Sequence, residues 1–194
     1  MIDFAEFDRR PMIVAITGPN GSGKTTFYHT YLSASGLRFV NADVLAAELL
    51  VEPYAAARLA NALRRTLLGR GESFVFETVF SDPVGDKVAF LEEAVGRGYE
   101  VAVCYIGLAD ATLSAERVAM RTLKGGHDVP GENLQARFPR TLNNLREAII
   151  RLPHVLVYDN SDLMVPFRPV AVFKQGRLCD AQPPIPAWLQ PMIP

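Results

Sequence analysis

The sequence predicts an α/β domain in which a five-stranded parallel sheet is covered by helices on both faces. Short apolar runs rich in β-branched residues alternate along the chain with longer segments of helical periodicity, which is the pattern of parallel strands joined by crossover helices. Hydrophobic residues make up 49% of the 194 residues and charged residues 21%, as in ordinary globular domains that bury a core. We therefore expect one domain.

The five strands are expected where apolar runs are bounded by turn-forming residues, at residues 12–18, 38–43, 73–78, 99–108 and 154–161. Helices are expected between them, at residues 25–36, 44–50, 53–71, 81–98, 111–124 and 132–152. Asp82 is the expected N-cap of the helix at 81–98, with Pro83 as its first helical residue. Asp110 is the expected N-cap of the helix at 111–124.

The C-terminal segment, residues 169–194, has a different pattern. "PVAVFKQGRLCD" predicts a β-hairpin that turns at Gln175-Gly176, and "AQPPIPAWLQPMIP" contains too many prolines for a helix or a central strand. We expect the part around Trp188 to pack on the body of the domain as a brace; a short partner-binding tail is the alternative. The expected division is therefore residues 1–168 as the main unit and residues 169–194 as a hairpin and tail on the same domain.

The stretch "AITGPNGSGKTTFY", residues 15–28, fits the phosphate-loop pattern G-x-x-x-x-G-K-[ST] between a strand and a helix. Its glycines let successive backbone N–H groups point inward at the positive end of a helix. Lys24 would reach the β- and γ-phosphates, and the Thr25 hydroxyl would ligate Mg²⁺. The motif thus predicts a nucleotide-binding site in a P-loop NTPase/kinase fold, with ATP and Mg²⁺ as the expected cofactors. The expected ATP-binding residues are Gly18, Pro19, Asn20, Gly21, Ser22, Gly23, Lys24, Thr25 and Thr26.

Polar residues follow the predicted strands where ligands bind in parallel sheets. Asp43 ends the second strand and could take the proton from an attacking hydroxyl, or it could only cap the helix that starts at Val44. Glu77 and Thr78 end the third strand, where Glu77 could hold Mg²⁺ through water, bind the acceptor, or simply be exposed before a loop. Asp159 and Asn160 end the fifth strand, so all three groups should converge near the phosphate loop.

A basic group surrounds the break "GGHDVPGE" at residues 125–132. Arg117, Arg121 and Lys124 share one helix face, and Arg137 and Arg140 share another just beyond the break. Two basic faces around a Gly-Gly hinge predict a helical lid at about residues 110–150 that closes on phosphates and neutralises transition-state charge. The alternative is that both are solvated helix faces, and a lone histidine at position 127 is more often solvated than bound to ligand.

Composition excludes several classes of function. The net charge is −1, and no basic stretch is interleaved with aromatic residues, so we expect no binding to nucleic acid. No signal peptide is visible and no apolar run reaches transmembrane length, which predicts a cytoplasmic protein without a membrane partner. The two cysteines, Cys104 and Cys179, are far apart and form no metal motif.

Several segments together resemble the zeta-toxin family of P-loop kinases, in its compact branch often labelled predicted ABC-type ATPases. They span about residues 12–160 and include "GPNGSGKTTF", "NAD", "FETVFS", "SAERVAMR", "GGHDVP" and "ARFPRTLNNL". The resemblance implies an ATP-dependent kinase of a nucleotide sugar, typically UDP-N-acetylglucosamine. By matching motifs it implies that Asp43 is the catalytic base, that Glu77 and Thr78 orient the sugar, and that Arg117 and Arg121 stabilise the transferring phosphoryl group. An antitoxin partner does not follow from these residues.

The sequence thus favours a phosphotransferase that uses an alcohol group as acceptor. The catalytic residues are expected to be Lys24, Asp43, Arg117 and Arg121, and the substrate-binding residues Asp43, Glu77, Thr78, Arg137 and Arg140. Two alternatives stay open. The acceptor could be that of a gluconate-, shikimate- or chloramphenicol-type kinase, or the protein could be a nucleotide-gated regulatory ATPase.

Overall fold

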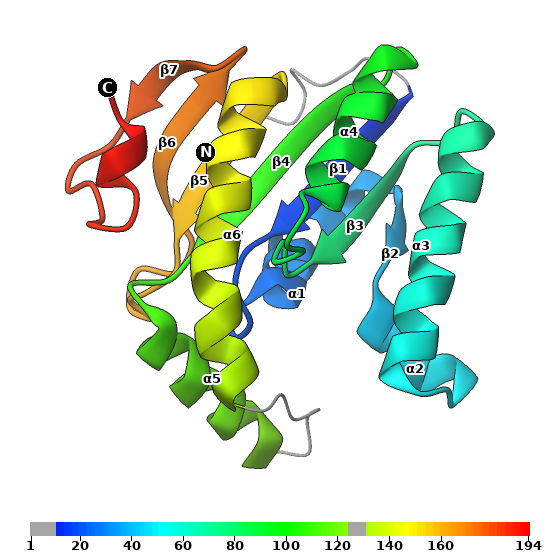
Figure 1. Ribbon diagram of the computed structural model, residues 1–194, viewed down its shortest axis with the longest axis horizontal. Helices are drawn as coiled ribbons and strands as arrows, with labels where there is room; N and C mark the ends of the chain where they lie inside the picture. The colour runs from blue at the N-terminus through cyan, green and yellow to red at the C-terminus, as the bar shows by residue number, and fades with distance from the viewer. Residues whose placement is uncertain (1–10, 124–130) are drawn as a thin grey trace.

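The computed structural model describes residues 11–123 and 131–194, and the main feature is one seven-stranded sheet (Figure 1). The strand order is β2-β3-β1-β4-β5-β6-β7. Five strands are parallel: β1 Met12–Thr17, β2 Arg38–Val40, β3 Phe74–Thr78, β4 Glu100–Gly107 and β5 His154–Asp159. β6 Arg168–Lys174 and β7 Arg177–Ala181 continue the sheet in antiparallel fashion. The predicted parallel core and C-terminal hairpin are therefore confirmed, and the two form a single mixed sheet.

β1 lies between β3 and β4 in the middle of the sheet, and all six of its residues are buried. A strand covered on both faces can be apolar throughout, which explains why "MIVAI" shows no alternation of polar and apolar residues. Its last residue, Thr17, pairs in register with Thr78 of β3 and Tyr105 of β4. The phosphate-loop motif therefore leaves the sheet at its centre.

Helices cover both faces of this sheet, as predicted. One face carries α3 Pro53–Gly69, α4 Asp86–Gly96 and α6 Gly131–Arg151, whose apolar residues share a core with the strands. The other face carries α1 Lys24–Phe27, which continues as the π turn η2 Tyr28–Leu32 and the 3₁₀ turn η3 Ser33–Ser35. α2 Ala42–Leu49 and α5 Ala111–Leu123 lie at the carboxyl end of the parallel strands, the lower edge in Figure 1. No helix in the described ranges has the length and apolarity needed to span a bilayer.

Of the helix starts predicted at Asp82 and Asp110, the first was wrong. α4 begins at Asp86 after Gly85, so neither Asp82 nor Pro83 starts it. The reason lies in tertiary contacts, because Nδ2 of Asn144 on α6 donates to the backbone carbonyls of Phe80 and Asp82 and holds this segment as a loop. The predicted cap at Asp110 is confirmed, since its Oδ1 accepts a hydrogen bond from the Leu113 N–H at 2.8 Å.

Asp43 also differs from its predicted place at a strand end. β2 stops at Val40, and Asp43 lies in the first turn of α2. The N-cap of α2 is Asn41, whose Oδ1 accepts from the backbone N–H groups of Asp43 at 2.7 Å and Val44 at 3.3 Å. The interpretation of Asp43 as the cap of this helix is therefore wrong. Among the described residues, the side chain that caps α2 is that of Asn41 and not the Asp43 carboxylate.

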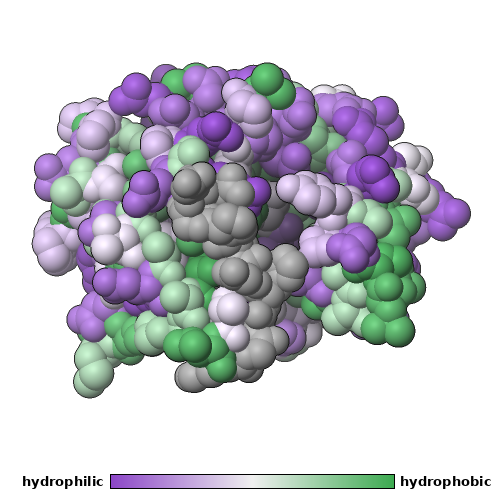
Figure 2. Space-filling view, turned by 60° about the horizontal axis from the view of Figure 1, so that its bottom comes forward, coloured by the Kyte–Doolittle hydropathy of each residue, from purple (hydrophilic) through white to green (hydrophobic). Residues whose placement is uncertain are grey.

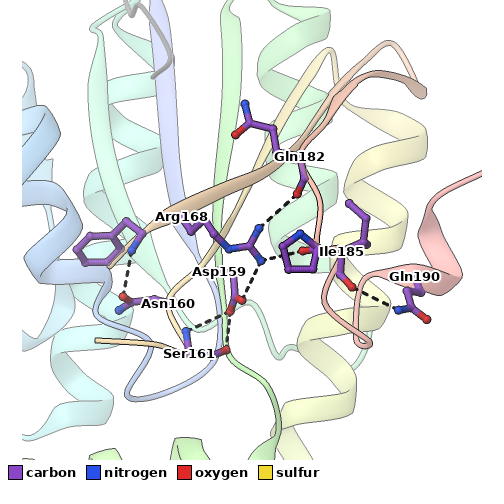
Figure 3. A network of polar contacts seen from close by, with 9 residues as sticks. Asp159, Asn160, Ser161, Arg168, Gln182, Ile185 and Gln190 are labelled. Carbon is purple, nitrogen blue, oxygen red and sulfur yellow. Dashed lines mark hydrogen bonds and ion pairs between the residues drawn. The ribbon is translucent and has the colours of Figure 1, made fainter. Parts of the chain in front are cut away.

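The C-terminal hairpin turns at Gln175-Gly176, with φ angles of 51° and 73° that suit a tight turn between twisted strands. Beyond it, Trp188 is only 8% exposed and packs on Tyr105, with ring centroids 5.8 Å apart. A Cβ at Gly107 would lie 2.2 Å from the Trp188 ring, so only glycine fits there. Figure 3 shows a second attachment, in which the Arg168 guanidinium contacts Asp159 and the backbone carbonyls of Gln182 and Pro184.

The centre of the predicted lid cannot be compared with the structure. Lys124, the Gly125-Gly126 hinge and His127 lie outside the described residues. The flanking helices α5 and α6 are described and pack against each other.

Candidate active site

The phosphate loop connects β1 to α1 at the carboxyl end of the sheet, and close packing fixes its backbone. Gly18 has a φ of 137°, and a Cβ there would lie 2.1 Å from the backbone oxygen of Ile106 on β4. Gly21 has a φ of 73°, and a Cβ there would lie 3.0 Å from both Cβ of Arg117 and the backbone oxygen of Ser114 on α5. A side chain at either position would push the loop away from its supports, so the motif glycines are required by space as well as by conformation.

Lys24 reaches back across this loop. Its ammonium donates to the Pro19 carbonyl at 2.9 Å, and the residue is only 6% exposed. Burial holds the pKa of Lys24 below its usual value; the carboxylates of Glu77 and Asp43 oppose this shift, and the guanidinium of Arg121 adds to it. Lys24 therefore lies in the field of both acidic and basic side chains, as is common for residues at functional sites.

Glu77 is held in place by two hydrogen bonds. Its Oε2 accepts from the Thr25 hydroxyl at 2.8 Å and from Nδ2 of Asn41 at 2.9 Å. One buried asparagine thus caps α2 through its oxygen and orients Glu77 through its nitrogen. Asn41 was not among the predicted site residues. Its position before the first helical residue indicates an N-cap, but nothing in the sequence links it to Glu77.

Asn160, after β5, fastens the other side of the loop. Its Nδ2 donates to the Ser22 carbonyl at 2.9 Å, and its Oδ1 accepts from the Phe167 N–H at 3.2 Å. Arg117 contacts the same segment, because its guanidinium donates to the carbonyls of Asn160 at 2.7 Å and Ser161 at 2.9 Å. In this arrangement Arg117 braces the phosphate loop from α5.

An open cleft of about 670 Å³ adjoins the loop between α2, α3, the segment after β3, and α6. Figure 2 views this end of the molecule and shows the surface hollowed near its centre, with hydrophilic residues beside the hollow. The cleft brings together all five residues predicted to bind substrate, together with the predicted catalytic Lys24: Asp43, Glu77, Thr78, Arg137 and Arg140. Arg117 and Arg121 do not line it.

The cleft also contains charged residues that sequence reasoning missed: Arg58, Arg64, Asp82 and Lys87. Both carboxylate oxygens of Asp82 are buried, and neither has a hydrogen-bond partner in the described parts of the chain. The sequence predicted Asp82 to be a helix cap. It lies in the cleft instead, because Asn144 holds the segment around it as a loop. A single sequence offers no signal for Arg58 or Arg64, because both lie in an ordinary amphipathic helical pattern.

The residues present fit Mg²⁺ bound together with nucleotide phosphates. Thr25 and Glu77 bring a hydroxyl and a carboxylate oxygen within 2.8 Å of each other beside Lys24, and Mg²⁺ takes oxygen ligands. Within residues 11–123 and 131–194, no group of three or more His, Cys, Asp and Glu side chains is placed to hold a metal. A site with one or two protein oxygens is the usual arrangement when phosphates and water complete the shell.

Comparison with known proteins agrees with this geometry. Residues 13–139 match the family model AAA_33, described as an AAA domain, and so the match covers more than half of the chain. The chain belongs to this family. None of the curated proteins matches it.

Solved structures with the same fold include the AvrRxo1-ORF1:AvrRxo1-ORF2 complex with sulphate ions, at 17% identity and a TM-score of 0.68. That match covers 98% of this chain and 65% of the other, so this chain spans about two thirds of that protein. A structure from the PezAT toxin–antitoxin system of Streptococcus pneumoniae matches at 14% identity and a TM-score of 0.54, covering 78% of this chain and 69% of the other. A gluconokinase from Sinorhizobium meliloti 1021 matches at 19% identity and a TM-score of 0.51. That match covers 81% of this chain and 87% of the gluconokinase. The fold is that of P-loop kinases.

Proposed function

We propose that the protein is an ATP-dependent kinase that transfers the γ-phosphoryl group to a hydroxyl of a small molecule bound in the cleft. The observation that carries this proposal is the position of the cleft, which opens from the phosphate loop and is lined by Lys24, Asp43 and Glu77. A loop that served only to hydrolyse ATP would need no cavity of about 670 Å³ beside it, whereas this volume suits a small ligand. The AvrRxo1-ORF1:-ORF2 complex, which shares the fold, was also solved with ATP.

In this proposal Asp43 is the general base. It lies in the first turn of α2, is not used as a cap, and lines the cleft, so its carboxylate is available to a substrate hydroxyl. Lys24 leaves the Pro19 carbonyl and binds the phosphates, since a charge-assisted bond to phosphate is stronger than one to a neutral carbonyl. Thr25 and Glu77 would hold Mg²⁺ directly or through water, and the ion would supply positive charge beside the phosphates.

The proposed acceptor is a nucleotide-linked sugar such as UDP-N-acetylglucosamine, as the resemblance to zeta-toxin kinases implies. Asp82 supports a hydroxylated acceptor, because a buried carboxylate without a partner in the described residues accepts hydrogen bonds from hydroxyl groups. Arg137 and Arg140 of α6 line the same cleft and add positive charge to it.

The test is incubation of the protein with labelled ATP, Mg²⁺ and a panel of nucleotide sugars, free sugars, gluconate and shikimate. We expect label to move to one acceptor much faster than to water. Asp43→Asn should lower that transfer by about a hundred- to ten-thousandfold. Its melting temperature should match that of the wild type, because Asn41 is the cap. Glu48→Gln, another acid on α2, is the matched control and should keep full activity.

Two results would contradict the proposal. Phosphate released only to water, whatever acceptor is added, would favour the regulatory ATPase. Normal transfer by Asp43→Asn would exclude it as the base and make Glu77 the next residue to test. Transfer to gluconate or shikimate rather than to a nucleotide sugar would keep the kinase and replace the acceptor.

A further inference from the structure

Arg64 is the most deeply buried cation in the part of the cleft away from the phosphate loop. It lies on the α3 face that carries the buried residues Ala56, Ala60 and Leu67, and it is only 6% exposed. Its guanidinium lies over the Phe76 ring of β3, with the central carbon 5.0 Å from the ring centroid. The aliphatic stem and the ring therefore fix the guanidinium at the wall of the cleft.

This guanidinium has few partners. It has five N–H donors, and the acceptor found for it among the described residues is Oδ1 of Asn61, at a long 3.4 Å. No carboxylate in those residues forms an ion pair with it. Buried arginines are normally paired, because an uncompensated charge is expensive to desolvate. Burial accordingly lowers the pKa of Arg64 to about 10, although the side chain still carries its proton at neutral pH.

The neighbouring Arg65 shows what an ordinary arginine on this helix does. It lies over the Phe90 ring at 5.8 Å, but its side chain is 57% exposed and its Nη1 pairs with Glu93 at 3.4 Å. The same residue type, on the same helix and over the same type of ring, is therefore satisfied by the protein itself. Arg64 is not.

The surroundings of Arg64 are positively charged. The cleft is lined by Lys24, Arg58, Arg64, Lys87, Arg137 and Arg140 against the acids Asp43, Glu77 and Asp82. A second pocket of about 270 Å³ shares Asn61, Arg64 and Lys87 with the cleft, so Arg64 stands where two cavities adjoin. A cavity with excess cations and a fork of unused donors is complementary to an oxyanion.

We propose that Arg64 binds an oxyanion of the acceptor, a phosphate or a carboxylate, at the end of the cleft built by α3 and β3. This inference rests on the proposed function in one respect, which is that the bound anion belongs to the phosphoryl acceptor. It assigns the cleft two ends: Asp43 and Lys24 meet the reacting hydroxyl and the transferring phosphate, and Arg64 holds the anionic group that orients the molecule between them. Acceptors without an anionic group would then be poor substrates.

The test measures binding without catalysis. The phosphate loop is first saturated with a non-hydrolysable ATP analogue and Mg²⁺, and then inorganic phosphate or gluconate is titrated into wild-type protein and variants. Arg64→Met, which keeps an apolar stem, should weaken binding of the favoured anion about ten- to a hundredfold, the range for a lost bond to a charged group. Arg65→Met is the matched control and should change the affinity less than twofold.

Stability separates a ligand-binding role from a structural one. If Arg64 serves to bind a ligand, the melting temperature of Arg64→Met should equal or exceed that of the wild type, because the substitution removes a buried charge that lacks an ion-pair partner in the described residues. If Arg64→Met folds poorly, the same titration is done with Arg64→Gln. An anion affinity of Arg64→Gln equal to that of the wild type would overturn the proposal. Equal losses in Arg64→Met and Arg65→Met would also overturn it, since they would indicate general surface charge.

The two anions distinguish the group that is bound. Binding of phosphate that depends on Arg64 assigns a phosphorylated acceptor, and binding of gluconate that depends on Arg64 assigns a carboxylate. Binding of neither overturns the inference. The titration measures no phosphoryl transfer, so a lack of anion binding would leave the kinase proposal intact. Conversely, a lack of phosphoryl transfer in the acceptor panel would not change the interpretation of the titration.

Discussion

The two ends of the site are built in opposite ways. At the phosphate loop, polar side chains are bonded within the chain: Lys24 to Pro19, Thr25 to Glu77, and Asn160 to Ser22. In the cleft, Arg64 has one long hydrogen bond and Asp82 has buried oxygens without a partner in the described residues. The first end is organised before any ligand binds, whereas the second leaves charge to be satisfied by the ligand. Substitutions should therefore act mainly on catalysis and stability at one end, and mainly on affinity at the other.

After Asp43→Asn, the largest effect is expected at Lys24. Lys24→Ala removes the cation that would contact the transferring phosphate, and such a group typically contributes about a hundred- to a thousandfold to turnover. The loss also relieves burial of a charge, so the variant should stay folded. Single-turnover kinetics with labelled ATP, together with thermal melting, check both parts. Wild-type turnover in a folded Lys24→Ala protein would refute the role of the loop in catalysis.

A smaller effect, on stability, is expected at Asn160. Asn160→Ala leaves the Ser22 carbonyl and the Phe167 N–H unpaired in a buried region, which should lower the free energy of unfolding by about 3 kcal/mol. Urea denaturation measures this loss, and ATP-analogue titration should show weaker binding. Asn143→Ala, at an exposed position of α6, is the control and should change stability by less than about 0.5 kcal/mol. Equal free energies of unfolding for the two variants would contradict the view that hydrogen bonds within the chain organise the phosphate-loop end.

The smallest effect is expected at Asp82, with the opposite sign. Asp82→Asn removes a buried charge without a partner in the described residues, so the free energy of unfolding should stay constant or rise by about 1 kcal/mol. The KM for the acceptor should rise while the affinity for ATP stays the same. Urea denaturation and steady-state kinetics provide these values. A clear loss of stability would show that Asp82 is satisfied by the protein and would move it out of the acceptor-binding set.

The comparison between the two ends also separates what could be predicted from what could not. The phosphate-loop residues are contiguous, so their spacing alone indicated a strand, a turn and a helix, and the structure has these elements at Met12–Thr17 and from Lys24 onward. The hairpin turn at Gln175-Gly176 was equally local. Asn41 gave no such signal for Glu77, because the two residues lie 36 positions apart. Arg64 and Asp82 gave none, because what distinguishes them is the lack of partners among the described residues.

The two errors in the prediction have different origins. Asp82 followed by Pro83 is a good local helix start, but Asn144 on α6 holds the carbonyls of Phe80 and Asp82 and delays the helix to Asp86. Asp43 looked like the end of a strand, yet β2 stops at Val40, where its in-register pairing with Phe76 of β3 ends. At Asp82 a contact between distant segments overrode a local preference worth about 1 kcal/mol, whereas at Asp43 a neighbouring residue, Asn41, caps the helix.

The sequence by itself determined the α/β order of elements, the buried central strand and the phosphate loop, because each depends on periodicity or on residues that are adjacent in the chain. Only the tertiary structure decided which charged side chains enter the cleft and which of them lack partners. Arg64 and Arg65 are neighbours in an amphipathic helix, and no local pattern tells them apart. One faces Phe76 in the cleft and the other pairs with Glu93 at the surface, since helix geometry turns successive residues by about 100°.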